Sequence, residues 1–63
     1  MKEYTAYIKE YNKDNILNPS IQGKEMSIDE LIEFWALNNS DVESYQLFEI
    51  TDDNSFICIA EKL

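Results

Sequence analysis

Histidine and arginine are absent from this sequence of 63 residues, and cysteine, glycine and proline each occur once. Without histidine, no imidazole can act as a general acid or base, and one cysteine cannot complete a zinc site of nitrogen and sulfur ligands. A single cysteine also cannot form a disulfide within the chain, which excludes a small disulfide scaffold. We therefore expect no metal, no cofactor and no catalytic residues.

Positive charge and long apolar runs are also scarce. Five lysines stand against thirteen Asp and Glu residues, which gives a net charge of -8. Because binding to phosphates needs many cations, we expect no direct contact with nucleic acid. No stretch approaches the ~20 apolar residues of a membrane span, and the first residues lack the apolar core of a secretion signal. The sequence thus predicts a cytoplasmic protein without membrane contact.

The residues that are present have a globular composition, with 44% hydrophobic residues and one Trp, four Tyr and three Phe. The length allows one small acidic domain, residues 1–63, and a domain of this size buries only about 60% of its unfolded surface. Repulsion among the acidic side chains lowers its stability further. A second copy or a tightly held partner would relieve both weaknesses.

The first strand is predicted at residues 3–11, where polar and apolar side chains alternate. We expect Tyr4, Ala6 and Ile8 to share its buried face. The polar connection that follows is long for a small domain, which favours a short extra strand at residues 20–26.

A hairpin is predicted near the C-terminus, with strands at residues 44–50 and 55–61 and a turn at residues 51–54. An even-numbered loop without a bulge would place four side chains on the core face: Phe48, Ile50, Ile57 and Ile59. The outer face would then carry Tyr45, Leu47, Glu49, Phe56, Cys58 and Ala60.

A helix is predicted to begin after Ser27, because Glu30 three residues later completes a capping box. Asn38 and Asn39 predict its end, since asparagine tolerates the left-handed conformation of a helix C-terminus. Apolar side chains at helical spacing form one stripe, which comprises Ile28, Leu31, Ile32 and Trp35. Together the elements predict an α+β fold, with one helix on a mainly antiparallel sheet of three or four strands.

The acidic residues are concentrated in one part of the chain. Residues 25–61 contain ten Asp and Glu residues and no cation. Asp29 and Glu33 lie at i,i+4 on the helix without a lysine, an arrangement that slightly destabilises the isolated helix. Such spacing, about 5–6 Å between Cβ atoms, roughly matches that of phosphates along a DNA strand. Two interpretations stay open: a solubilising surface, or a functional surface that mimics DNA.

On the functional interpretation, the acidic side chains contact a basic partner and two apolar side chains anchor the complex. The predicted acidic contacts are Asp29, Glu30, Glu33, Asp41, Glu43, Glu49, Asp52 and Asp53, and the predicted anchors are Leu37 and Tyr45. The run at residues 52–54 lacks the glycine and the distal glutamate of an EF-hand loop, so we expect no calcium site.

Several segments resemble the first domain of ArdA-type antirestriction proteins: Tyr7-Ile8, Tyr11-Asn12, Gly23 and Glu43-Ser44-Tyr45. The chain is similar, more loosely, to small acidic anti-defence proteins of phages, including anti-CRISPR proteins. The resemblance implies an acidic, phosphate-mimicking inhibitor carried by a phage or mobile element.

We therefore predict a non-enzymatic protein inhibitor that occupies the nucleic-acid-binding site of a basic host protein. The alternative is a small oligomerising adaptor or an antitoxin-like protein that binds a partner. In the adaptor, a homodimer would form through the outer sheet face, with Tyr45, Leu47, Phe56 and Cys58 in contact.

Overall fold

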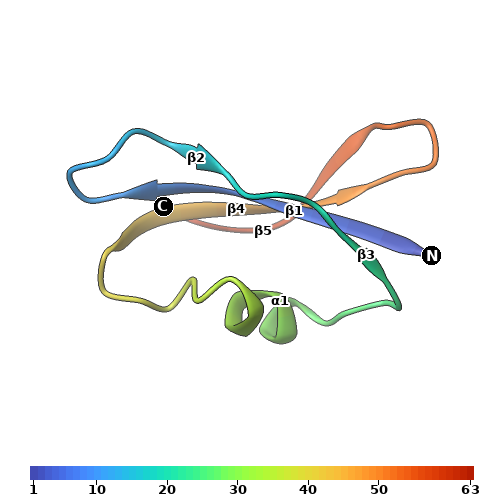
Figure 1. Ribbon diagram of the computed structural model, residues 1–63, viewed down its shortest axis with the longest axis horizontal. Helices are drawn as coiled ribbons and strands as arrows, with labels where there is room; N and C mark the ends of the chain where they lie inside the picture. The colour runs from blue at the N-terminus through green and yellow to red at the C-terminus, as the bar shows by residue number, and fades with distance from the viewer.

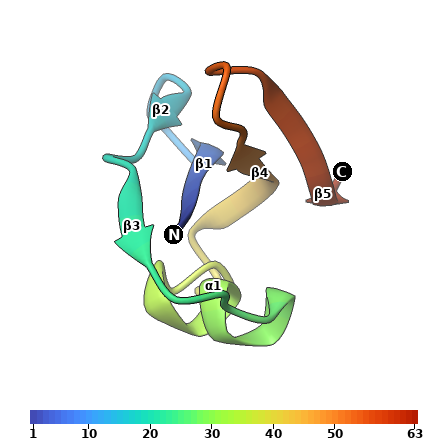
Figure 2. The ribbon, with the colours of Figure 1, turned by 90° about the vertical axis from the view of Figure 1, so that its right-hand side faces the viewer.

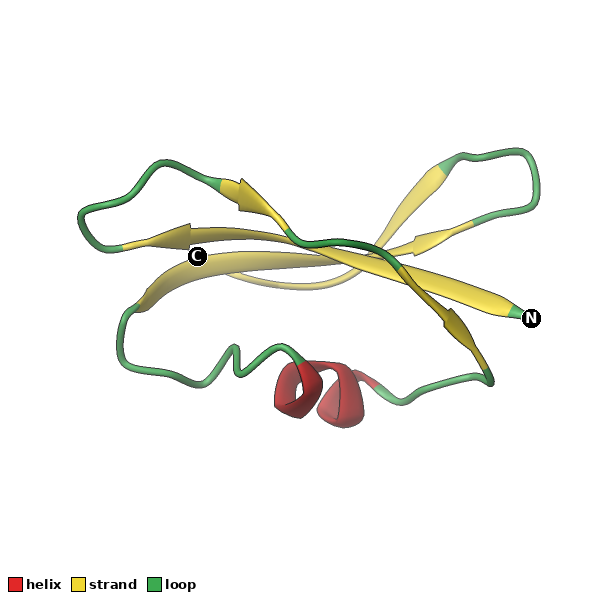
Figure 3. Cartoon of the chain, in the orientation of Figure 1, coloured by secondary structure: helices red, strands yellow, loops and turns green.

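The chain has an α+β fold in which one short helix covers one side of an antiparallel sheet (Figure 1; Figure 3). The computed structural model describes all residues, 1–63. In chain order the elements are β1 (Lys2–Glu10), β2 (Ile16–Leu17), β3 (Ile21–Gly23), α1 (Ile28–Phe34), β4 (Val42–Ile50) and β5 (Phe56–Lys62).

The sheet has five strands, more than the three or four predicted. β1 pairs with β4 along one side and with β2 and β3 along the other, and β5 pairs only with β4. β3 lies inside the segment 20–26, where an extra strand was predicted. β2 was missed, because its two residues are too few to show a periodic pattern and are held by pairing with Tyr7 and Ile8.

The hydrophobic core lies between α1 and the sheet. Tyr4, Ala6 and Ile8 of β1 are buried there, which confirms the face predicted from their alternation. The other elements complete the core with Leu31, Leu37, Val42 and Leu47.

The face of strand β4 that packs against the helix is the opposite of the predicted one. Leu47 lies directly opposite Ala6 of β1 and is fully buried. Side chains directly opposite one another in an antiparallel pair share a face, so the buried face of β1 determines that of β4. The prediction that Phe48 and Ile50 form the core is therefore wrong, and both residues are partly exposed on the far side of the sheet.

Two irregularities separate β5 from its predicted register. Ile50 pairs with Phe56, so the turn contains five residues instead of an even number. The register shifts again farther along β4, which leaves Ile59 as an extra, bulged residue in β5. Ile59 packs against the core, whereas Ile57 is 48% exposed. Only one of these two predicted core residues is therefore in place.

Helix α1 begins where the sequence predicts and ends earlier. The Ser27 hydroxyl accepts the Glu30 N–H, and the Glu30 carboxylate accepts the Ser27 N–H, each at 3.1 Å. These contacts confirm the capping box. The last helical residue is Phe34, well before the predicted end at Asn38.

The predicted apolar stripe of the helix is present in part. Leu31 is fully buried, and Ile32 and Trp35 pack against the core. Ile28 is 41% exposed, because it stands at the first helical position, where the helix has only begun. The helix is neither long enough nor apolar enough to cross a lipid bilayer.

A Schellman turn built on an alanine ends the helix. The Ala36 N–H donates to the Glu33 carbonyl at 3.2 Å, and the Leu37 N–H donates to the Ile32 carbonyl at 2.9 Å. Ala36 has a φ of 54°, in the left-handed region that glycine enters without steric cost. The turn reverses the chain and places Leu37 in the core with Leu31.

Replacing Ala36 with glycine should stabilise the domain by about 0.5–1 kcal/mol. The left-handed conformation costs alanine roughly 1–2 kcal/mol, which exceeds the roughly 0.4–1 kcal/mol that glycine loses through its more flexible unfolded state. Thermal unfolding would show a Tm higher by several degrees. Ala36→Val should lower the Tm, because its branched side chain disfavours a left-handed φ. An unchanged Tm for Ala36→Gly would show that the left-handed conformation of Ala36 does not strain the fold.

Candidate functional site

The predicted acidic contacts lie in three regions of the fold and do not form one continuous surface. They are α1 with Asp29, Glu30 and Glu33, the two ends of β4 with Asp41, Glu43 and Glu49, and the β4–β5 turn with Asp52 and Asp53. In Figure 1 and in Figure 2, the β4–β5 turn lies on the side of the sheet away from α1. The sheet therefore separates the acidic residues of the turn from those of the helix.

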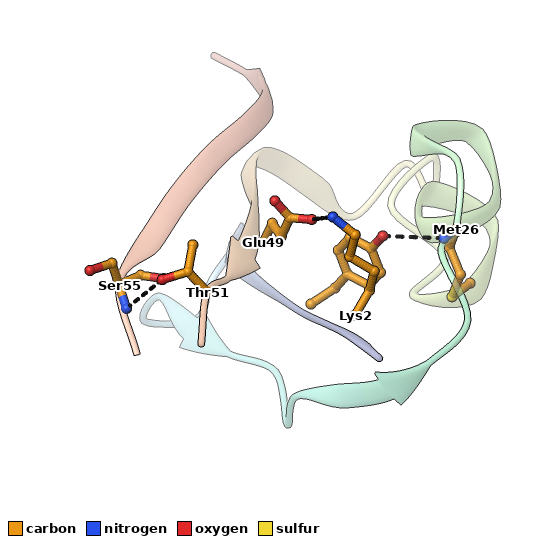
Figure 4. Close-up of polar contacts among 6 residues, drawn as sticks. Lys2, Met26, Glu49, Thr51 and Ser55 are labelled. Carbon is orange, nitrogen blue, oxygen red and sulfur yellow. Dashed lines mark hydrogen bonds and ion pairs between the residues drawn. The ribbon is translucent and has the colours of Figure 1, made fainter. Parts of the chain in front are cut away.

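Two of the acidic residues of β4 are paired with lysines of β1. Lys2 Nζ lies 2.7 Å from Glu49 Oε1 (Figure 4), and Lys9 Nζ lies 3.7 Å from Glu43 Oε2. The hydrogen bond and the negative charge of Glu49 raise the pKa of Lys2 above its usual value. Glu43 and Glu49 thus contribute less negative field than their number suggests.

Two further carboxylates hold local structure. The backbone N–H and side chain of Ser27 lower the pKa of Glu30 in the capping box. Asp53 accepts hydrogen bonds from the Thr51 hydroxyl and the Ser55 N–H, and these contacts, that of Thr51 first, lower its pKa below the usual 3.8. Thr51 and Ser55 also bond one another across the turn (Figure 4). A turn therefore lies where the sequence predicts one, but it extends through Ser55, one residue beyond the predicted range 51–54.

Four of the predicted acidic contacts remain free of such partners. Asp29, Glu33, Asp41 and Asp52 are exposed, and none forms an ion pair or a side-chain hydrogen bond within the chain. Their charges are therefore available to an outside partner.

Asp29 and Glu33 are the pair that the structure brings together. They lie one turn apart on α1 and line a shallow hollow of about 560 Å³ beside the chain that follows the helix. No lysine lines this hollow, and its other lining residues are Ile32, Ala36, Asn38 and Asn39. Two carboxylates in this arrangement can accept hydrogen bonds from an arginine or bind an ammonium group.

The predicted apolar anchors are misplaced. Leu37, predicted to contact a partner, is fully buried because the Schellman turn directs it into the core. Tyr45 lies opposite Ile8 on the helix side of the sheet and packs against the core. Leu37 therefore cannot contact a partner, whereas Tyr45 is partly exposed.

One exposed aromatic residue on the helix had no role assigned from the sequence. Phe34 is 58% exposed, and its ring packs edge-on against Trp35 at a centroid distance of 5.6 Å. Its position at the border of the apolar stripe is the signal that could have identified it. Phe34 is the large apolar side chain nearest in sequence to Glu33 that a partner can reach.

The predicted homodimer face is also changed by the structure. Leu47 is fully buried and Tyr45 packs against the core, so neither lies on an outer face. Phe56 and Cys58 are exposed, as the sequence predicts. The outer face instead joins these two residues to Phe48, whose ring lies 5.9 Å from that of Phe56.

The hydrogen bonds of Asp53 should make stability depend on acid pH. Because its pKa is lowered in the folded state, the ionised carboxylate stabilises the fold above about pH 4, and this contribution is lost as the pH falls further. We expect Asp53→Asn to lower the Tm at pH 6 more than at pH 3. Asp52→Asn, at an exposed neighbour without a side-chain hydrogen bond, serves as the control. Equal losses for Asp53→Asn at both pH values would contradict the assignment.

No group of three or more Cys, Asp or Glu side chains is close enough together to hold a metal ion. Comparison of the chain with protein-family models, curated protein sequences and solved structures gives no match. The resemblance to ArdA-type antirestriction proteins therefore stays a prediction.

Proposed function

We propose that this protein is a non-enzymatic inhibitor of phage or mobile-element origin that acts in the host cytoplasm. It occupies the nucleic-acid-binding site of a basic host protein with the exposed side of α1. The observation that carries this proposal is the pair Asp29 and Glu33, which share a hollow and have no cation partner in the chain.

The distribution of lysines supports the proposal. Three of the five lysines are in ion pairs within the fold, at distances of 2.7–3.7 Å. Each of these pairs is formed by residues of β1, β4 or the β1–β2 turn, and none reaches α1. The lysines in these three ion pairs thus neutralise acidic residues of the sheet, and they leave the helix surface negative.

The chemistry of the proposed contact follows from the side chains that are free. A site that holds DNA phosphates presents lysine and arginine side chains, and arginine binds a carboxylate in the same bidentate way as a phosphate. Asp29 and Glu33 would take the place of phosphates, and the exposed ring of Phe34 would supply an apolar contact next to Glu33. Charge would speed association, whereas the apolar contact would slow dissociation.

The proposed contact is smaller than the one predicted from the sequence. The β4–β5 turn, which carries Asp52 and Asp53, lies on the side of the sheet away from α1, so these two residues do not belong to the helix surface (Figure 1). Glu43 and Glu49 already have lysine partners. The proposal therefore rests on the helix surface alone.

A displacement assay tests this function. Protein immobilised on a resin would capture proteins from a bacterial lysate at low salt, and each protein eluted by high salt would be identified and purified. Each would then be bound to a labelled DNA duplex, and we expect this protein to displace the duplex from at least one of them. If no captured protein releases its duplex, the proposed inhibition is wrong.

A further inference from the structure

Strand β5 forms an edge of the sheet that lacks the usual protection. It pairs only with β4, so about half of its backbone N–H and C=O groups point outward. None of the backbone hydrogen bonds outside the helix and strands involves residues 56–62. In Figure 2, β5 stands at the rim of the sheet with no segment beyond it.

The side chains of β5 make this edge apolar on both faces. Phe56 and Ile57 point to opposite faces and are 54% and 48% exposed, and Cys58 is exposed as well. Residues 54–60 carry no charge, although 29% of the residues in the chain are charged. An exposed, uncharged strand rich in β-formers is a template for pairing with another strand.

The opposite edge of the sheet is protected against pairing. β2 and β3 have only two and three residues, and Pro19 between them has no N–H to donate. The N–H of Asn18 points inward and donates to the Ala6 carbonyl at 2.8 Å. The β2–β3 edge of a second copy is therefore unsuited to pairing with β5. The β5 edge of that copy is free to pair.

We propose that β5 pairs antiparallel with β5 of a second copy of this chain, so that the two sheets continue across a two-fold axis. A symmetric pairing of one edge with itself closes at two chains and forms no fibre. This inference does not depend on the proposed inhibition, because it concerns a different surface.

The register follows from the position of the charged residues. A two-fold axis at Cys58 places uncharged residues opposite one another along the exposed half of the strand. An axis at Ile59 would set Glu61 opposite Ile57, and an axis at Ile57 would set Glu61 opposite Asp53. The first of these buries a charge against an apolar side chain and the second opposes like charges.

Charges at the two ends of β5 complement one another in this arrangement. Lys62 lies at the C-terminal end of β5 and is the only cation after residue 24. Asp52 and Asp53 lie in the turn that precedes the strand. Antiparallel pairing brings Lys62 of each copy beside the acidic turn of the other copy. The dimer thus contains two attractive contacts in a protein whose net charge of -8 otherwise repels a second copy.

The bulge at Ile59 limits how far the pairing extends, because bulges twist an edge away from a partner. Ile59 and Ala60 both pack toward the core. The segment before the bulge, from Phe56 to Cys58, stays regular and exposed. With the axis at Cys58, Phe56 and Ile57 of one copy lie opposite Ala60 and Ile59 of the other, so the shared ladder reaches the bulge one residue from the axis and stays short.

Sedimentation equilibrium of the purified protein, at micromolar to millimolar concentrations, tests the dimer. The wild type should reach twice its 7.4 kDa monomer mass. Cys58→Lys sets two lysines opposite one another and should weaken the dimer at least ~tenfold. Leu17→Lys, at a 56% exposed position on the protected edge, is the matched control and should leave the dimer intact.

Two further measurements test the register and serve if Cys58→Lys fails to fold. Lys62→Glu should weaken the dimer, and the double variant Lys62→Glu/Asp52→Lys should restore it by exchanging the charges. Mild oxidation should link the dimer through Cys58, the only cysteine. A wild type that stays monomeric, masses above two chains, or dissociation by Leu17→Lys and not by Cys58→Lys would overturn the proposal.

Discussion

Leu47→Ala is expected to lower the free energy of unfolding by about 2–5 kcal/mol, the usual cost of emptying a fully buried leucine site. A chain of this length has a total stability of only about 3–9 kcal/mol. The variant should therefore be largely unfolded well below the Tm of the wild type, with a Tm reduced by at least ~10 °C. Thermal unfolding followed by circular dichroism measures this loss.

Ile50→Ala is the matched control, because Ile50 lies on the same strand but faces away from the helix and is partly exposed. Its loss should be no more than about 1 kcal/mol, since only part of the side chain is removed from water. The comparison decides which face of β4 packs on the helix. If Ile50→Ala lowers the free energy of unfolding more than Leu47→Ala does, the face with Phe48 and Ile50 packs on the helix, as the sequence predicts, and the observed face is wrong.

Asp29→Lys/Glu33→Lys should abolish binding to the basic partner, with affinity reduced at least ~100-fold, because two attractive contacts become repulsive. Glu30 is left unchanged, since its carboxylate caps the helix. The Tm should stay close to that of the wild type, because both replaced side chains are exposed and unpaired. The displacement assay with a captured DNA-binding protein measures the effect.

Asp14→Lys/Glu25→Lys provides the control with the same change in net charge. Both residues are exposed and lie outside α1. If the two double variants lose affinity equally, total charge and not the helix surface governs binding. If Asp29→Lys/Glu33→Lys still displaces the duplex like the wild type, the proposed contact on α1 is wrong.

Local signals in the sequence predicted local structure well. The capping box at Ser27 and Glu30 is formed by residues three apart, so its chemistry is complete within one helical turn. The buried face of β1 follows from alternation within a single strand. The end of the helix was predicted less well, because Ala36 adopts a left-handed conformation that its side chain disfavours, and burial of Leu37 compensates for the strain.

The candidate site could be predicted only as a set of charges. The lack of cations in residues 25–61 is a property of the sequence, and it indicates a negative protein in any fold. Pairing of Lys2 with Glu49 joins residues 47 positions apart, and no spacing rule anticipates it. The pairing of β1 with β4 therefore determines which carboxylates stay free, and the sequence alone does not show it.

By itself, the sequence determined the composition of this protein: its acidity, its lack of imidazole and guanidinium groups, the start of its helix and the apolar face of β1. The tertiary structure decided which of the two apolar faces of β4 is buried, because both faces carry large apolar side chains and only contact with β1 distinguishes them. It also decided that β5 forms an exposed edge, since a strand becomes an edge only through the absence of a neighbour.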